Sequence, residues 1–385
     1  MNNTDEKILY FDHNATTPLA PEAMAAMMPY MQKEFGNPSS GYFLGSRAKE
    51  AVELARRQTA SLIGALPDEI CFTSGGSESN NFAVKGVVDF TRPSRCHIIT
   101  SAIEHPAILN PLLYLLEIGV DVTIAPVDGL CRVDPDYIRR AIRPETRLIT
   151  IMLANNETGT IQPVKEIAAV AAEKGILFHT DAAQAVGKIP VDVSELGVDF
   201  LSIAGHKLYG PKGIGALFIK KEKLLTPLIH GASQEMGKRA GTESVILEAG
   251  LGAACERAAE TIKEDMARLS SLRDRLQGLL SEAIKGLVVN GHLVERLPNT
   301  LHVSVPGLEG AKILEGIPRL LASTGAACHD RSVKLSHVLS AMGIPPGEGM
   351  GALRLTIGRT TAEKDVEEAA GLLIERIRRL RVGKG

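Results

Sequence analysis

Short apolar runs recur between residues 68 and 220, and segments with one apolar face lie between several of them. Each run has the length of a buried strand, whereas the intervening segments repeat their apolar positions with the period of a helix. The runs lie at residues 69–73, 97–101, 120–125, 147–153, 175–178 and 198–203. Strands that alternate with helices in this way predict an α/β fold with a mainly parallel sheet flanked by helices.

The pattern changes after residue 245. A long helical pattern extends from about 245 to 284, with a predicted break near Asp265. Shorter elements follow, namely strands at 299–305 and 353–357, a loop at 322–329, and helices at 336–342 and from about 360. Because 385 residues exceed what one hydrophobic core usually serves, we predict two domains. Residues 16–255 would form the large domain, and residues 1–15 with 256–385 a smaller α+β domain.

The composition is that of a globular protein without a polyanionic partner. Charged residues make up 23% of the chain and the formal net charge is −2, so no basic surface for nucleic acid or an acidic membrane is expected. No run approaches the roughly 18 apolar residues that span a bilayer, and the polar first residues are unlike a signal peptide. We therefore expect a cytoplasmic protein that binds neither nucleic acid nor membrane.

Polar residues cluster where the last two predicted strands end. The run at 175–178 leads to Asp181 and Gln184, and the run at 198–203 leads to His206 and Lys207. In open α/β sheets, ligands bind outside the carboxyl ends of the strands, which is where these four side chains are expected. The sequence therefore predicts a ligand site at this edge of the sheet.

Lys207 has the setting of a reactive amine. It stands between an apolar strand and a Gly-Pro-Lys-Gly turn, so partial desolvation would lower its pKa and leave a neutral amine able to form a Schiff base. Asp181 would suit the pyridinium nitrogen of pyridoxal phosphate, whose ring serves as an electron sink. From these residues alone, a surface lysine and a helix-capping aspartate are equally open interpretations. A Walker-type phosphate loop is excluded, because the glycines at 205–210 are not followed by Lys-Ser or Lys-Thr.

Two segments carry a resemblance to a known family. The sequence His-Thr-Asp-Ala-Ala-Gln at 179–184 and the sequence Gly-His-Lys at 205–207, with its glycine-rich turn through Gly215, resemble the cysteine desulfurase and selenocysteine lyase family. This family lies within class V of the pyridoxal-phosphate-dependent aminotransferases, and the resemblance extends in order over nearly the whole chain. It implies a type I pyridoxal-phosphate fold, pyridoxal 5'-phosphate as cofactor, a homodimer, and no metal.

The resemblance also assigns the cofactor site. Gly76 and Ser77, between a strand and a helix, are expected at the phosphate, where backbone N–H groups and the helix dipole attract an anion. His105 corresponds to the histidine that stacks on the pyridine ring, and Thr242 to a threonine that reaches the phosphate of the neighbouring subunit. The remaining cofactor-binding residues that the family implies are Asn156, Asp181, Gln184, His206 and Lys207. Taken alone, these motifs are as typical of a tight turn, a structural histidine and a surface loop.

The five cysteines are scattered and include no C-x-x-C pair, which argues against a disulfide framework or a zinc cluster. Cys328 follows small residues and precedes His329, a setting that suits an exposed thiol, although most such cysteines are inert. Its Ser-Thr-Gly-Ala-Ala-Cys context resembles that of the catalytic cysteine of the family. The resemblance further implies that the guanidinium group of Arg354 binds the substrate carboxylate with two hydrogen bonds. It also places Asn14 and Asn156 beside the substrate. Lys207, Cys328 and His105 are the expected catalytic residues.

The resemblance implies a cysteine desulfurase, which converts L-cysteine to L-alanine while Cys328 takes up sulfur as a persulfide. A sulfur-acceptor protein would then supply iron–sulfur clusters or other thio-cofactors. Two departures favour selenocysteine lyase, acting on L-selenocysteine, as the alternative: Ala204 replaces a common serine, and Thr-Gly-Ala-Ala-Cys-His replaces Ser-Gly-Ser-Ala-Cys. More distant alternatives are an aminotransferase of the same fold and a non-catalytic sulfur carrier or scaffold.

Overall fold

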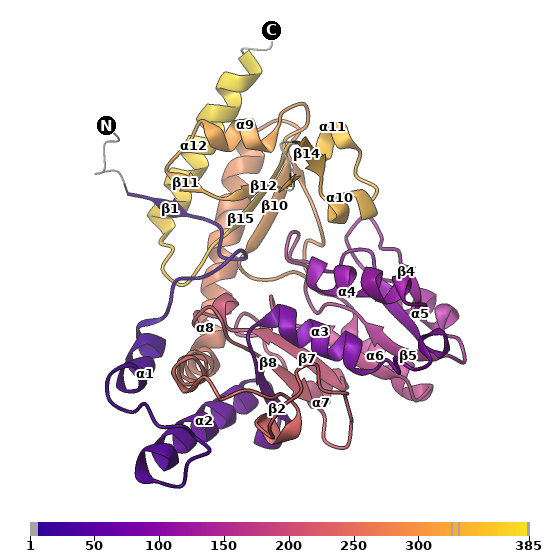
Figure 1. The fold of residues 1–385 in the computed structure, drawn as a ribbon. Coiled ribbons are helices and arrows are strands. Elements are labelled where there is room, and N and C mark those ends of the chain that lie inside the picture. The colour runs from indigo at the N-terminus through magenta and orange to yellow at the C-terminus, as the bar shows by residue number, and fades with distance from the viewer. Residues whose placement is uncertain (1–6, 325, 330–331, 383–385) are drawn as a thin grey trace.

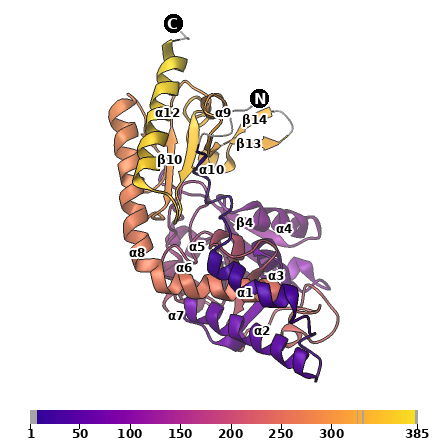
Figure 2. The same cartoon turned by 90° about the vertical axis from the view of Figure 1, so that its left-hand side faces the viewer.

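The computed structural model describes the backbone of residues 7–324, 326–329 and 332–382, and the side chains of these residues apart from 326–329 and 332–334. Figure 1 shows two lobes, with a seven-stranded sheet in the lower lobe and a four-stranded sheet in the upper lobe. The long helix α8 (Val245–Ala283) runs through both lobes (Figures 1 and 2). Among the described residues, no helix is both long enough and apolar enough to cross a bilayer.

The large sheet has the strand order β2-β8-β7-β6-β5-β3-β4. Its strands are β2 (Ile70–Thr73), β3 (His97–Ser101), β4 (Asp121–Ala125), β5 (Thr146–Thr150), β6 (Leu177–Asp181), β7 (Phe200–Ala204) and β8 (Gly215–Ile219). Only β8 runs antiparallel to its neighbours β2 and β7, and the other pairs are parallel. The predicted α/β fold with a mainly parallel sheet is therefore confirmed.

Helices cover both faces of this sheet, which explains the unbroken apolar runs. Every residue of β3, β7 and β8 is buried, as in strands that are covered on both faces. Ile98 packs in a core with α3 (Gly76–Gly86) and α4 (Pro106–Glu117), whereas its neighbour Ile99 packs in the core on the opposite face. The helices of that second core are α1 (Pro21–Gln32), α2 (Phe43–Leu62), α5 (Pro135–Ala141), α6 (Val164–Glu173) and the first half of α8; α7 (Val193–Leu196) also joins it.

The predicted break near Asp265 is wrong, because α8 is one continuous helix from Val245 to Ala283. Its interior contains no proline, and the Asp265 carboxylate accepts a hydrogen bond from the Thr261 hydroxyl at 2.9 Å instead of competing for the backbone. The same hydroxyl donates to the carbonyl of Arg257 at 3.0 Å, a contact that bends helices without breaking them. Figure 2 shows that α8 changes direction between the lobes.

The upper lobe is built on an antiparallel sheet of order β12-β15-β10-β9. Its strands are β9 (Val288–Val289), β10 (Thr300–Ser304), β12 (Ser323–Thr324) and β15 (Ala352–Thr356). The second half of α8, α9 (Gly310–Glu315) and α12 (Glu363–Val382) pack against it in one core. Leu9 and Phe11 enter this core, since β1 (Leu9–Tyr10) pairs with β11 (Leu320–Leu321). The start of the chain therefore lies beside its last third.

The segment at 322–329 forms strands and not the predicted loop. Ser323 and Thr324 form β12, and β13 (Ala326–His329) pairs with β14 (Ser332–Leu335) as an antiparallel hairpin. Its small residues lack the side chains typical of strands, so the sequence pattern hides a pairing that backbone hydrogen bonds supply. The hairpin leads into the short helices α10 (His337–Ala341) and α11 (Pro346–Gly349).

Candidate active site

A cavity of about 430 Å³ lies at the carboxyl ends of β6 and β7, the edge of the sheet that the sequence predicts for a ligand. It is lined by Asn14, Ala15, Gly76, Ser77, Asn80, His105, Ala107, Met152, Ala154, Asn156, Asp181, Ala183, Gln184, Ala204, His206, Lys207 and Arg354. All the predicted site residues except Thr242 and Cys328 are in this set. Tertiary structure thus brings together side chains from both sheets.

Lys207 closes a 3-10 turn, η3 (Gly205–Lys207), directly after β7. Its ammonium donates to the main-chain carbonyls of Asn14 and, at 2.8 Å, of Ala15. Burial, followed by the nearby positive charge of Arg354, lowers the pKa of Lys207 to about 8. A substantial fraction of the amine is therefore neutral near physiological pH, as the sequence predicts for a nucleophilic lysine.

Asp181 ends β6 and is held from two sides. One carboxylate oxygen accepts from the Asn80 amide at 2.7 Å, and the other accepts from the backbone N–H of Ala183 at 2.9 Å. The side chain is buried yet lines the cavity. A fixed carboxylate in such a position can stabilise a positive charge in the cavity.

His105 and His206 both lie in surroundings that disfavour the charged imidazolium. His105 is the N-cap of α4, where its Nδ1 accepts from the Ala107 N–H at 3.1 Å, so any ring proton sits on Nε2. Burial lowers the pKa of His105 and lowers that of His206 to about 4, and the charge of Lys207 acts in the same direction on both. His206 Nδ1 lies 3.2 Å from the Thr16 hydroxyl. His105 lines the cavity, where its imidazole can lie against a flat ring.

The first turn of α3 offers unpaired backbone N–H groups to the cavity. Gly75, at φ +148°, adopts a conformation that favours glycine, and it starts an 11-residue helix at Gly76. A Cβ on residue 76 would lie 3.2 Å from the Cβ of Ala204, so the glycine keeps space between α3 and the end of β7. Since the first N–H groups of a helix have no partner within it, the backbone N–H groups of Gly76 and Ser77 can donate to an anion.

Arg354, on β15, reaches the cavity from the upper sheet. Its Nη2 donates to the Asp12 carboxylate at 2.8 Å and to the Ser323 hydroxyl at 3.1 Å, and its Nη1 donates to the Asn156 carbonyl at 3.1 Å. The buried Nε of Arg354 and the buried Oδ1 of Asn156 have no hydrogen-bond partner in the described part of the chain. The two groups are therefore available to a ligand at the junction of the lobes.

Asn14 and Gln184 meet on the floor of the cavity. The Gln184 amide donates to the Asn14 carbonyl at 3.0 Å, the same carbonyl that accepts from Lys207. The side chain of Asn14 is engaged within the protein, because its Nδ2 donates to Thr300 Oγ1 at 2.9 Å and to the Asn156 carbonyl at 3.2 Å. A direct contact of Asn14 with substrate stays a prediction.

Two predicted residues lie outside the cavity lining. Thr242 is exposed, in a segment tied to α3 by an ion pair between Arg239 and Glu78, at 3.0 Å. The backbone of Cys328 lies in β13, opposite Val333, and its side chain falls outside the described residues. The hairpin that carries Cys328 follows Ser323, which bonds to both Asp12 and Arg354, so the cysteine segment starts at the edge of the cavity.

Sequence reasoning missed three residues of this site. Asn80 lies one helical turn beyond Gly76, so the i,i+4 spacing on α3 was a signal for it. Lys188 lies four positions beyond Gln184 and donates to its side-chain oxygen at 2.7 Å. Asp12 lies in the N-terminal stretch that resembles the opening motif of the family, but its pairing with Arg354 carried no sequence signal, because the two residues meet only through the fold.

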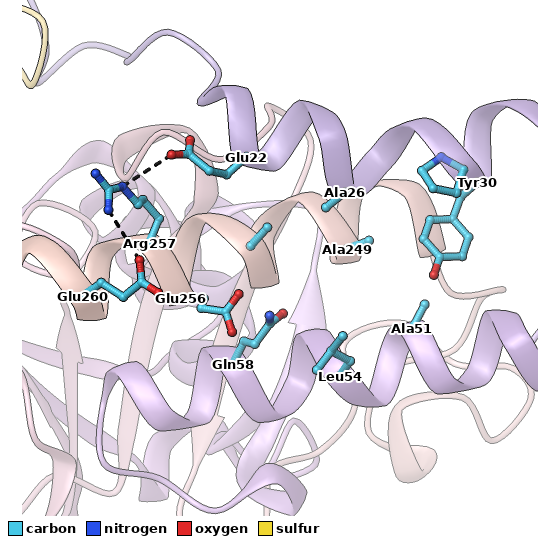
Figure 3. A pocket seen from close by; sticks show the side chains of 12 residues that line it. Glu22, Ala26, Tyr30, Ala51, Leu54, Gln58, Ala249, Glu256, Arg257 and Glu260 are labelled. Atoms are coloured by element: carbon cyan, nitrogen blue, oxygen red, sulfur yellow. Dashed lines mark hydrogen bonds and ion pairs between the residues drawn. The ribbon is translucent and has the colours of Figure 1, made fainter.

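A second cavity, of about 510 Å³, lies between α1, α2 and α8 (Figure 3). Arg257 bridges two of its acids, Glu22 and Glu260, at 3.4 Å each. The rest of the wall consists of alanines, of Pro29, Tyr30, Leu54 and Gln58, and of one further carboxylate, Glu256. None of the predicted site residues lines this cavity.

The chain matches the family model "Aminotransferase class-V" over residues 9–368. It is 47% identical over 382 residues to "Cysteine desulfurase IscS" of Methanosarcina thermophila, covering 98% of this chain and 94% of that protein. A protein of the same name from Dictyoglomus turgidum (strain DSM 6724 / Z-1310) is 46% identical, with 97% and 95% covered.

Two solved structures share the fold. One is a "NIFS-LIKE PROTEIN" with a TM-score of 0.90 and 35% identity, covering 96% of this chain and 99% of that chain. The other, "SspA in complex with cysteine", has a TM-score of 0.80 and 37% identity, covering 90% and 98%. Both similarities include the two sheets, since they span nearly the entire chain.

Proposed function

Because the chain belongs to the class-V aminotransferase family, we propose that it is a cysteine desulfurase that uses pyridoxal 5'-phosphate to convert L-cysteine to L-alanine. The observation that carries the proposal is the cavity in which Lys207, Asp181, His105 and Arg354 converge. Relatives named as cysteine desulfurases match nearly the whole chain and support the same activity. They do not favour the selenocysteine lyase alternative, which rests on Ala204 and the Ala-Ala-Cys-His sequence.

The residues of the cavity fit this cofactor. Gly76 leaves an open cradle for a phosphate at the N-terminus of α3. The unpartnered Oδ1 of Asn156 and the amide of Gln184 suit the ring hydroxyl, and the fixed Asp181 carboxylate suits a protonated ring nitrogen. Ser77 and His206 complete the phosphate end in this proposal. When bound, the cofactor supplies an electron sink for the bond changes at the substrate Cα.

Lys207 and His105 carry the proton chemistry. Lys207 would hold the cofactor in the resting protein and, as a neutral amine, would take the proton from the substrate Cα. Its lowered pKa of about 8 supports this role, because an amine with its ordinary pKa would be almost fully protonated at neutral pH. His105 packs against the ring as a neutral imidazole, and Asp181 holds the proton on the ring nitrogen.

Arg354 and Cys328 act on the substrate. The guanidinium of Arg354 binds the substrate carboxylate, and Asn14 and Asn156 lie beside it. The Cys328 thiolate attacks the substrate sulfur, so an S–S bond forms while the C–S bond breaks. The electron pair of that C–S bond passes to the carbon, which becomes the methyl group of alanine after protonation. Cys328 then carries a persulfide that an acceptor protein can take up for iron–sulfur clusters or other thio-cofactors.

The proposal includes a homodimer with shared sites. Met24, Met28 and Met31 are exposed on one face of α1, and Phe35 and Phe43 are exposed just beyond it. An apolar face of this kind is typical of a surface covered by another protein, and a second copy of the chain would cover it. Thr242, exposed and outside its own cavity, is the residue proposed to reach the partner's phosphate site.

Domain division and compartment follow the same proposal. A division into residues 16–255, and 1–15 with 256–385, is supported by the separate core of the upper lobe, which includes Leu9 and Phe11. The cysteines whose side chains are described are all free and buried, which suits a reducing cytoplasm.

The function is tested with the purified chain, pyridoxal 5'-phosphate and L-cysteine in the presence of a thiol reductant. Alanine and sulfide should form in equal amounts, because the reductant releases the outer sulfur of the persulfide. In a separate reaction without the reductant, alkylation followed by mass spectrometry should find an added sulfur on Cys328. Parallel reactions with L-selenocysteine compare the alternative substrate. Transamination products without sulfide would exclude the proposal.

A further inference from the structure

Lys188 is a buried lysine that the proposed chemistry does not use. Only 8% of the residue is exposed, and no carboxylate contacts its amine among the described residues. Its Nζ donates to the side-chain oxygen of Gln184 at 2.7 Å and to that of Asn14 at 3.0 Å. Lysine is almost never fully buried without a partner that compensates the loss of hydration, so these two bonds need an explanation.

The two bonds determine which way two amides face. The Lys188 amine donates to the side-chain oxygens of Gln184 and Asn14, so both oxygens point toward Lys188. The NH₂ group of Gln184 must then point away from Lys188, toward the Asn14 carbonyl at 3.0 Å and the cavity. Asn299 donates to the same Asn14 oxygen at 3.1 Å, which supports the orientation of Asn14 independently.

Asn14 accepts hydrogen bonds from both Lys188 and Lys207. The side-chain oxygen of Asn14 accepts from Lys188, and its main-chain oxygen accepts from Lys207. The charged groups that face Lys188 are Lys207 and Arg354, both positive, and these charges together with burial hold the pKa of Lys188 well below its ordinary value. A neutral lysine has two N–H groups, which match the two oxygens that accept from it.

We propose that Lys188 is a positioning residue, which acts through Gln184 and Asn14 to hold the Gln184 NH₂ group toward the cofactor and the Asn14 carbonyl beneath Lys207. The inference rests on the proposed function, because it assumes a cofactor in the cavity. Lys188 itself does not line the cavity, so its effect on the cofactor must pass through these two neighbours.

A double-mutant cycle tests the proposal on cofactor binding, without using turnover. The dissociation constant of pyridoxal 5'-phosphate and the pH titration of its visible absorption are measured for the native chain, Lys188→Met, Gln184→Leu and the double variant. Lys188→Met should weaken binding by about tenfold, since it leaves buried oxygens unpaired and frees the Gln184 amide to turn. It should also shift the absorption titration. In the Gln184→Leu background the same substitution should weaken binding less than it does in the native chain, because one of the two routes of Lys188, the one through Gln184, is already removed.

Lys165→Met is the matched control. Lys165 is exposed on α6, and in the described part of the chain it makes no hydrogen bond or ion pair with Lys188, Gln184 or Asn14. A Lys188→Met effect of equal size with and without Gln184 would overturn the proposal, as would unchanged binding and absorption. Native chain that binds the cofactor but forms no alanine would count against the proposed function alone. A native chain that binds no cofactor would contradict both the positioning role of Lys188 and the proposed function.

A second comparison does not require Lys188 to be replaced. Gln184→Glu keeps one side-chain oxygen facing Lys188 and replaces the NH₂ group by a second oxygen. If Lys188 contacts this position, the Gln184→Glu variant should melt at or above the temperature of the Gln184→Leu variant, because the new carboxylate favours the protonated, positive form of Lys188. If Lys188 does not contact this position, the Gln184→Glu variant should melt well below the Gln184→Leu variant, because its buried carboxylate has no positive partner. In both variants the cofactor should bind more weakly than in the native chain.

Discussion

The Arg354 guanidinium lies 2.8 Å from the Asp12 carboxylate, although 342 positions separate the two residues in the chain. Ser323, at the start of the cysteine segment, donates to Asp12 at 2.9 Å and accepts from Arg354 at 3.1 Å. A substrate carboxylate that binds Arg354 therefore meets an arginine already oriented by two neighbours. The preformed geometry lowers the entropy lost when the substrate binds.

Replacement of Arg354 by lysine should raise the KM for L-cysteine by at least about tenfold. Lysine keeps the charge but cannot contact Asp12, Ser323 and a substrate carboxylate with one planar fork. The absorption of the bound cofactor should not change, because Arg354 is proposed to touch only the substrate. Steady-state kinetics and a cofactor spectrum measure both effects. Arg359→Lys is the control, since Arg359 pairs with Asp265 outside the cavity; an equal rise in its KM would contradict the assignment.

Replacement of Lys207 by alanine should leave a folded chain whose cofactor can be removed by dialysis. The anchoring amine is gone, and proton transfer at Cα loses its base, so turnover should fall by at least about a hundredfold. Borohydride treatment followed by peptide mass spectrometry should find the cofactor on the native peptide and on no peptide of the variant. Lys212→Ala, at an exposed lysine of the same turn, serves as control. A reduced adduct that persists in Lys207→Ala would show that another lysine is the anchor.

The cofactor-free chain should gain stability as pH rises through the titration range of Lys207. Its folded pKa is about 8 and its ordinary value is 10.5, so between these pH values the unfolded chain binds a proton that the folded chain does not. Stability rises with pH wherever the unfolded state binds more protons. Urea unfolding of the native chain and of Lys207→Met at pH 7.5, 9 and 10 gives the free energy of unfolding of each protein. The difference between the two proteins at each pH measures the contribution of Lys207. A difference that is constant with pH would refute the lowered pKa.

Replacement of Cys328 by alanine should abolish alanine formation from L-cysteine and leave cofactor affinity unchanged. Without a thiolate to accept the sulfur, the C–S bond has no route to cleavage, whereas Lys207, Asp181 and His105 are untouched. Alanine assays and cofactor titrations separate the two effects. Cys96→Ala provides the matched control, because Cys96 is buried at the start of β3, away from the cavity lining. Undiminished turnover by Cys328→Ala would rule out a persulfide on this residue.

Mixing two inactive variants should restore activity if Thr242 completes the partner's site. Thr242→Glu places a negative charge where the proposal expects a phosphate, and Lys207→Ala removes the amine. In a mixed dimer, the chain with Thr242→Glu keeps its Lys207 and receives an intact Thr242 from its partner, so one site is complete. Activity assays and sedimentation of the mixture after subunit exchange measure the result. A mixture that stays inactive while mixed dimers form would place Thr242 in its own subunit's site.

The sequence by itself determined the architecture of the large sheet and most of the site. Strands covered on both faces leave unbroken apolar runs, and the polar residues that follow β6 and β7 mark the carboxyl edge. Asp181 and Lys207 could be found because each follows its strand within a few residues, so that their placement depends on local structure. The segments around them also carried the family resemblance, which located Gly76, His105 and Arg354.

Only the tertiary structure decided the contacts that join distant residues. Asp12 meets Arg354 and Lys188 meets Asn14 because the N-terminal segment crosses between the two sheets, a path that no local pattern encodes. The continuity of α8 and the strand pairing of the cysteine segment likewise depend on partners elsewhere in the chain. Periodicity reports which side chains are buried, whereas burial of polar groups is decided by hydrogen-bond partners that only the fold supplies. The charge environment of Lys207 follows from the same contacts.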